Sequence, residues 1–239
     1  MVGGDARPTK LWLARVGIRW SRNPTIGTGR LEAFSDAVIA ILITVMVLEL
    51  KIPHGTGIHA LRPLVPIGLT YVLSFTFLGI YWNNHRHMLH GTGRVNGKVL
   101  WANLHLLFWL SLIPVATGWV GTNGFASLPV AMYGVVLFAD GTAYYILERT
   151  IVSSDAKNAL VAEAVARPTK EKLSVLVYAV AIPIAFADRW VSLALYVAVA
   201  LMWIVPDRRF ERAFERDRED RRALRIPPAT PSSSSDAPE

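Results

Sequence analysis

The stretch LEAFSDAVIAILITVMVLEL, residues 31–50, decides the fold because it is long and almost entirely apolar. About 20 residues of α-helix, each rising about 1.5 Å, cross the ~30 Å hydrocarbon core of a bilayer. Only Glu32, Asp36 and Glu49 carry charge within the stretch. A run of this kind predicts a membrane-spanning helix rather than the core helix of a soluble domain.

The composition of the whole chain agrees with this prediction. Its 239 residues are 52% hydrophobic and 18% charged, and they include no cysteine. Soluble domains carry about 25% charged residues, so the composition excludes a soluble enzyme. The lack of cysteine excludes a disulfide scaffold, thiolate metal sites and iron–sulfur clusters. The sequence therefore predicts an all-α integral membrane protein.

Five further apolar runs bring the predicted number of transmembrane helices to six per subunit. The six predicted spans are 31–50, 64–82, 99–120, 128–147, 173–187 and 190–205. Pro114 is expected to kink the third span, because proline leaves a carbonyl group of the preceding turn unbonded. Only Asp188 and Arg189 separate the last two spans, which predicts an antiparallel hairpin.

The basic residues predict the orientation of the chain. Of the 25 Lys and Arg residues, 22 fall in the N-terminal segment, the second and fourth connections and the C-terminal tail. The positive-inside rule then places both termini in the cytoplasm. The net charge of +7 is explained by these segments facing anionic lipids, so no nucleic-acid partner is expected. The predicted divisions are a basic cytoplasmic segment (1–28), a six-helix domain (29–206) and a charged extension with a disordered Pro/Ser-rich end (207–239).

A helical projection of the first span places several side chains on one face. At about 100° per residue, Ile41, Thr44, Val45 and Leu48 fall within one arc, together with Phe34. Asp36 points well away from this arc. If the arc lines a water-filled pore, Asp36 faces neighbouring helices; if Asp36 lines the water path, the arc faces lipid or protein.

Two other readings of the polar residues stay open. Asp36 and Asp140 lie inside predicted spans, where an ionisable side chain is costly and marks a functional candidate. They suggest a secondary or proton-coupled transporter. His85, His87 and His90 have a spacing that suggests a membrane metal enzyme, but interfacial histidines at the end of a span are the favoured interpretation. The sequence has none of the common nucleotide-binding or hydrolase motifs, so we predict that the protein is not an enzyme and has no cofactor or resident metal.

Residues 30–36 read Arg-Leu-Glu-Ala-Phe-Ser-Asp, which resembles the Arg-x-x-x-Phe-Ser-Asp signature of the transmembrane protein 175 family of potassium channels. Trp82 and His85, at the end of the second span, resemble the family's Trp-x-x-His pattern. The resemblance implies a homotetramer of single six-helix units, without a re-entrant pore loop. For a chain of this length it also implies a prokaryotic plasma membrane.

The resemblance also assigns roles to residues of the first span. It implies that this helix lines the pore, with the main apolar gate at Ile41 and further pore-facing side chains at Thr44, Val45 and Leu48. The signature residues Arg30, Phe34, Ser35 and Asp36 would tie the pore helix to its neighbours through Trp82, His85 and Asn103. An apolar constriction closes by dewetting and favours potassium over sodium only modestly, so potassium is the expected permeant ion.

Overall fold

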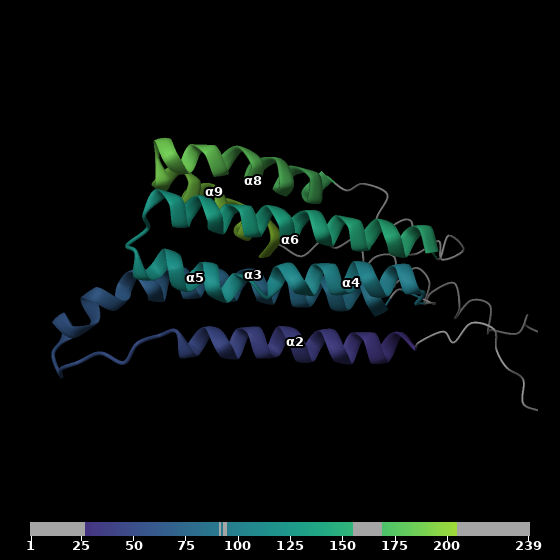
Figure 1. Cartoon of the computed structure of the whole chain (residues 1–239), viewed down its shortest axis with the longest axis horizontal. Coiled ribbons are helices and arrows are strands. Elements are labelled where there is room, and N and C mark those ends of the chain that lie inside the picture. The colour runs from purple at the N-terminus through teal and green to yellow at the C-terminus, as the bar shows by residue number, and fades with distance from the viewer. Residues whose placement is uncertain (1–26, 91, 93–94, 155–168, 205–239) are drawn as a thin grey trace, which may run out of the picture.

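The computed structural model describes residues 27–90, 92, 95–154 and 169–204. Within these ranges the chain forms helices and no strand, which confirms the predicted all-α class. The helices run side by side along one long axis, with α2 at one edge of the bundle and α8 at the other (Figure 1). Most of the predicted terminal segments, 1–28 and 207–239, lies outside the described residues.

Every predicted span coincides with one or two observed helices. The helices are α2 (Thr28–Leu48), α3 (Val65–His90), α4 (Gly97–Leu110), α5 (Ile113–Thr122), α6 (Ser127–Ser154), α8 (Thr169–Ala187) and α9 (Arg189–Ile204), with a 3-10 helix η1 (Ile58–Leu64) before α3. Four helical stretches are long and apolar enough to cross a membrane, and α9 is a shorter apolar helix. The total of six spans therefore stays a prediction.

The third predicted span is divided into α4 and α5. The break falls at Ser111 and Leu112, just before Pro114 rather than at it. Pro114 lies in the first turn of α5, where an N–H group has no helical partner to lose. At the other end of α4, the Asn96 side chain accepts a hydrogen bond from Val99 N at 3.0 Å and caps the helix.

The last two helices form the predicted tight connection, joined through Asp188 alone. Asp188 Oδ1 accepts a hydrogen bond from Trp190 N at 2.8 Å, so this aspartate caps the start of α9. Both helices pack against α6. Gly134 of α6 has no room for a side chain because Tyr196 of α9 lies directly against it.

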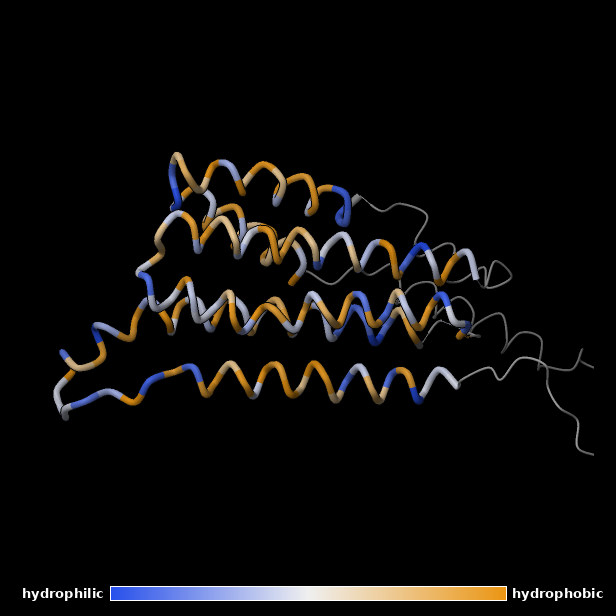
Figure 2. The backbone as a smooth tube through the Cα atoms, in the orientation of Figure 1, coloured by the Kyte–Doolittle hydropathy of each residue, from blue (hydrophilic) through white to orange (hydrophobic). Residues whose placement is uncertain are grey.

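Apolar residues dominate the middle of the helices, whereas polar residues gather toward their ends and in the connections (Figure 2). The side of α2 that faces the bundle packs against α3, α4 and α5. Its buried residues are Leu31, Ser35, Ile39, Leu42 and Met46. Their spacing of three or four residues is that of a single helical face, and the opposite side of α2 is exposed in one subunit.

Candidate functional site

The side of α2 opposite its buried face carries the four residues predicted to line a pore. Ile41 is 59% exposed, Val45 40% and Leu48 82%, and Thr44 is exposed as well. Large apolar side chains this exposed in one subunit require a cover of lipid or of other subunits. Phe34, two turns before Ile41, is also 50% exposed and so lies outside the buried network.

Thr44 is the polar member of this exposed row. Its hydroxyl group donates a hydrogen bond of 2.8 Å to the carbonyl oxygen of Ile41, one turn earlier in the same helix. The donor is therefore used within α2, while the lone pairs of the hydroxyl oxygen remain available. An oxygen atom in this state can accept a hydrogen bond from water or contact a cation.

A buried chain of hydrogen bonds ties α2 to α3 and α4. Asn103 donates from Nδ2 to Ser35 Oγ at 2.9 Å, and its Oδ1 lies 2.6 Å from His85 Nε2. Ser35 Oγ in turn donates to the carbonyl oxygen of Leu31 at 2.9 Å. Ser35, His85 and Asn103 are all 0% exposed. Because an amide oxygen only accepts, this arrangement assigns the ring proton of His85 to Nε2.

A second group joins α2 to α3 beside this chain. Trp82 Nε1 donates to Asp36 Oδ1 at 2.9 Å. One turn away on each helix, Arg86 lies 3.7 Å from the Glu32 carboxylate and also stacks over the Trp82 ring. The structure therefore places Asp36 against a neighbouring helix, which is the first of the two orientations that the projection allowed.

Arg30, His85 and His87 do not form a common site. Arg30, at the start of α2, is exposed, and Arg86 is the basic residue seen beside Glu32. His85 is bonded to Asn103, whereas His87 is exposed, so these two do not share a site. The His90 side chain lies outside the described part of the structure. Among the described residues, no three His, Asp or Glu side chains are grouped as metal ligands.

Comparison with known proteins relates this geometry to a family. A potassium channel of Chryseobacterium sp. (strain P1-3) is 48% identical over 187 residues, which cover 78% of this chain and 97% of the relative. The profile of the family described as Endosomal/lysosomal potassium channel TMEM175 matches residues 30–114. The chain belongs to the TMEM175 family of potassium channels. The match begins at Arg30 and contains α2, α3 and α4, the three helices that share the buried network.

Two further relatives extend the comparison. A potassium channel of Streptomyces collinus (strain DSM 40733 / Tue 365) is 33% identical over 128 residues, covering 50% of this chain and 62% of that relative. The crystal structure of a lysosomal potassium-selective channel TMEM175 homolog from Chamaesiphon minutus matches with a TM-score of 0.66 at 24% identity. It covers 74% of this chain and 96% of that one, which shows that the two share a fold.

This TMEM175 protein also has a buried hydroxyl chain that sequence reasoning missed. Thr117 of α5 donates to Ser74 of α3 at 2.6 Å, and Ser74 lies 2.8 Å from the Tyr133 hydroxyl of α6. All three residues are buried. In the sequence these residues are only isolated hydroxyl side chains inside apolar spans. Their pairing could not be predicted, because the bonded residues are 43 and 59 positions apart. Arg86 was missed for a similar reason, since it resembles any basic residue at a span end.

Proposed function

We propose that four copies of this chain assemble with their α2 helices around a central pore that conducts potassium. The observation that carries the proposal is the division of α2 into a buried face and an opposite face that exposes Ile41, Thr44, Val45 and Leu48. One helix cannot enclose a pore, so the lining of the pore must be built from the exposed α2 faces of several copies. Membership in a family of potassium channels supports the conduction of potassium.

The gate in this proposal is the ring formed by four copies of Ile41. A ring of apolar side chains expels water when narrow and admits ions when an outward shift of α2 widens it. The Thr44 oxygen, whose proton is directed to its own helix, would replace part of the hydration shell of an ion just beyond the gate. An apolar constriction of this kind favours potassium over sodium modestly, because potassium sheds its hydration more easily.

The buried network sets how α2 moves in this proposal. Asn103 bonds to both Ser35 and His85, and Trp82 bonds to Asp36, so one half of α2 is held to α3 and α4. The Ile41–Leu48 half of α2 is held mainly by apolar contacts through Leu42 and Met46. Contacts without directional bonds allow small displacements, and we therefore place the moving part of the pore helix at the gate.

The same proposal fixes the setting of the channel. The basic residues predict that both termini face the cytoplasm. The family resemblance and the single six-helix unit favour a prokaryotic plasma membrane. Residues 29–206 form the channel domain, and the segments 1–28 and 207–239 lie on the cytoplasmic side. Anionic lipid headgroups are the partners of the basic segments, and no nucleic acid is needed to explain the charge.

The test of the gate is a comparison of Ile41→Asn with Val47→Asn in planar bilayers under a potassium–sodium gradient. Val47 is the matched control because it lies on the same helix and is 46% exposed, but outside the arc of the gate. We expect stepwise wild-type currents that reverse toward the potassium potential. Ile41→Asn should raise the current several-fold by wetting the ring, and Val47→Asn should leave it close to wild type.

Equal effects of the two substitutions would show that Ile41 does not form the gate. The transporter alternative, with Asp36 and Asp140 as a relay, predicts slow and saturable uptake without unitary currents. The hydrogen bond of Asp36 goes to Trp82, whereas Asp140 lies on α6. Uptake in liposomes that is abolished by Asp36→Asn or Asp140→Asn, in a protein that gives no current, would replace the channel proposal.

A further inference from the structure

Asp140 is a buried acid that the proposed pore does not use. It lies near the middle of α6 and is 0% exposed. Neither of its carboxyl oxygens has a hydrogen-bond partner among the described residues. Buried polar groups are almost always bonded, so an acid left with two free oxygens in the interior of a membrane protein needs an explanation.

The groups that face Asp140 are tyrosines rather than cations. Tyr81 of α3, Tyr133 of α6 and Tyr178 of α8 are close enough to sense its charge. The sequence of α5 contains no ionisable residue, and the basic residues of α8 and α9 lie at the ends of these helices. On α4, His105 is exposed and accepts a hydrogen bond from Trp109.

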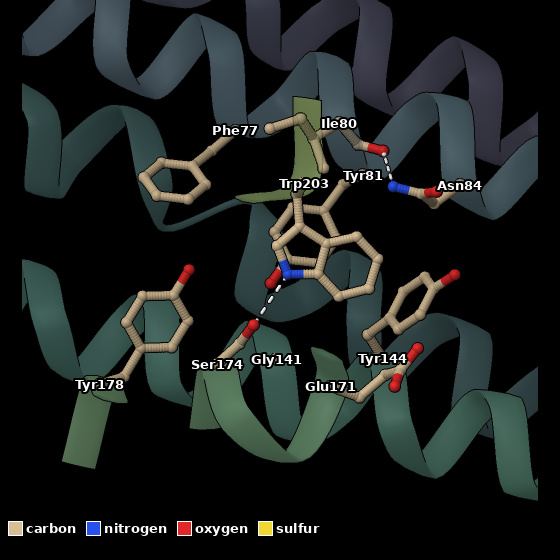
Figure 3. Close-up of a pocket in the computed structure, with 10 residues that line it drawn as sticks. All are labelled: Phe77, Ile80, Tyr81, Asn84, Gly141, Tyr144, Glu171, Ser174, Tyr178 and Trp203. Carbon is tan, nitrogen blue, oxygen red and sulfur yellow. Dashed lines mark hydrogen bonds between the residues drawn. The ribbon is translucent and has the colours of Figure 1, made fainter. Parts of the chain in front are cut away.

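A small cavity adjoins the site between α3, α6, α8 and α9 (Figure 3). Its volume is about 30 Å³, which is enough for one or two water molecules. The lining includes Tyr81, Gly141, Tyr144, Ser174, Tyr178 and Trp203. Gly141 directly follows Asp140, and Tyr81 and Tyr178, which line the cavity, also interact electrostatically with the acid. Water in this cavity would therefore reach the tyrosines that surround Asp140.

The polar side of the cavity extends toward one end of the bundle. Trp203 Nε1 donates to Ser174 Oγ at 2.8 Å, and Glu171 lines the cavity one turn of α8 closer to the start of that helix. Asn84, near the end of α3, lines it as well. These polar residues line the cavity from the helix ends toward Gly141, the neighbour of the acid, and none of them lies on the exposed face of α2.

We propose that Asp140 is a proton-binding site outside the pore, which holds its proton at neutral pH and exchanges it through the water-filled cavity between α3, α6, α8 and α9. The reason is that an ionised carboxylate without a nearby cation is strongly disfavoured in a buried site, and uptake of a proton removes the charge. The ligand is the proton itself, and water in the cavity is the proposed acceptor for the acid, since no described side chain bonds to its carboxyl oxygens.

The direct test is infrared spectroscopy of the purified full chain in lipid, with aspartate labelled with ¹³C so that aspartic and glutamic acids are resolved. At pH 8 we expect one C=O stretching band from a protonated aspartic acid in the wild type. Asp140→Asn should abolish the band, and the control Asp188→Asn should keep it. Asparagine also caps helices, so this control preserves the start of α9.

Three results would overturn the proposal: no such band in the wild type at pH 8, a band that persists in Asp140→Asn, or a band that disappears when potassium or sodium is added at constant pH. The last result would make the site a metal-cation site. The first and third results come from the wild type, so they hold even if the variant fails to fold.

A second readout is the pH dependence of the thermal midpoint in detergent. In an unfolded chain aspartate ionises near pH 4, whereas Asp140 is proposed to keep its proton in the fold. The folded state then binds more protons above that pH, so stability falls as pH rises. Asp140→Asn should remove this pH dependence. The thermal midpoint of the variant should therefore rise relative to that of the wild type with each pH unit from 5 to 8. A difference between the two midpoints that is constant across this range would contradict the proposal.

Discussion

At the residue scale, Asn103 links three helices through buried hydrogen bonds. It bonds to Ser35 of α2 and His85 of α3 from its own place on α4, and all three side chains are fully buried. Replacing it with alanine leaves the buried ring N–H of His85 without a partner, while Ser35 keeps its bond to the carbonyl oxygen of Leu31. A buried group without its partner costs about 1–3 kcal/mol, more than a lost surface hydrogen bond.

We therefore predict that Asn103→Ala lowers the free energy of unfolding by about 1–3 kcal/mol, the cost of one such group. The measurement is the thermal midpoint of the purified protein in detergent. Asn83→Ala is the control, because Asn83 is exposed and lies two residues before His85. Similar midpoints for the two variants would show that the buried chain does not stabilise the fold.

At the element scale, the pattern of apolar residues predicts where helices form but not how the helices contact one another. Each predicted apolar run coincides with one or two observed helices, because burial and lipid exposure both select apolar residues along a helix. The helix of the second predicted span, α3, extends to His90, eight residues beyond the predicted end, because residues 83–90, most of them polar, continue the helix past the apolar run. Bonds such as Ser74 to Tyr133 depend on how helices pack, and a single sequence holds no record of that packing.

The helices α3 and α5 are in close contact at Gly121. A side chain at Gly121 would place its Cβ atom 2.6 Å from the Cα atom of Ile67, so the two backbones touch. We expect Gly121→Ala to cost about 1–3 kcal/mol of stability, although alanine favours a helix over glycine. The control Gly68→Ala meets nothing within 4 Å and should be neutral or mildly stabilising. A Gly121→Ala protein as stable as Gly68→Ala would show that the helices can move apart freely.

At the scale of the whole molecule, the two edges of the bundle have different roles in the proposed assembly. The edge formed by α2 turns toward the other copies, while α8 lies at the opposite edge (Figure 1). Leu48 on α2 is 82% exposed and Val180 on α8 is 48% exposed. If α2 lines the pore, Leu48 of one copy lies close to Leu48 of its neighbours, whereas the Val180 side chains face lipid and lie far apart.

Cysteine cross-linking tests this difference without background, because the chain has no cysteine of its own. Under mild oxidation in membranes, Leu48→Cys should form a covalent dimer on non-reducing gels, since two cysteines close to one axis can pair. Val180→Cys should remain a monomer under the same conditions. Efficient dimers of Val180→Cys with none for Leu48→Cys would place α8 at the centre and remove α2 from the pore.

Native mass measurement of the uncross-linked protein should then give four copies, because a dimer would leave the exposed face of α2 incompletely covered around a pore.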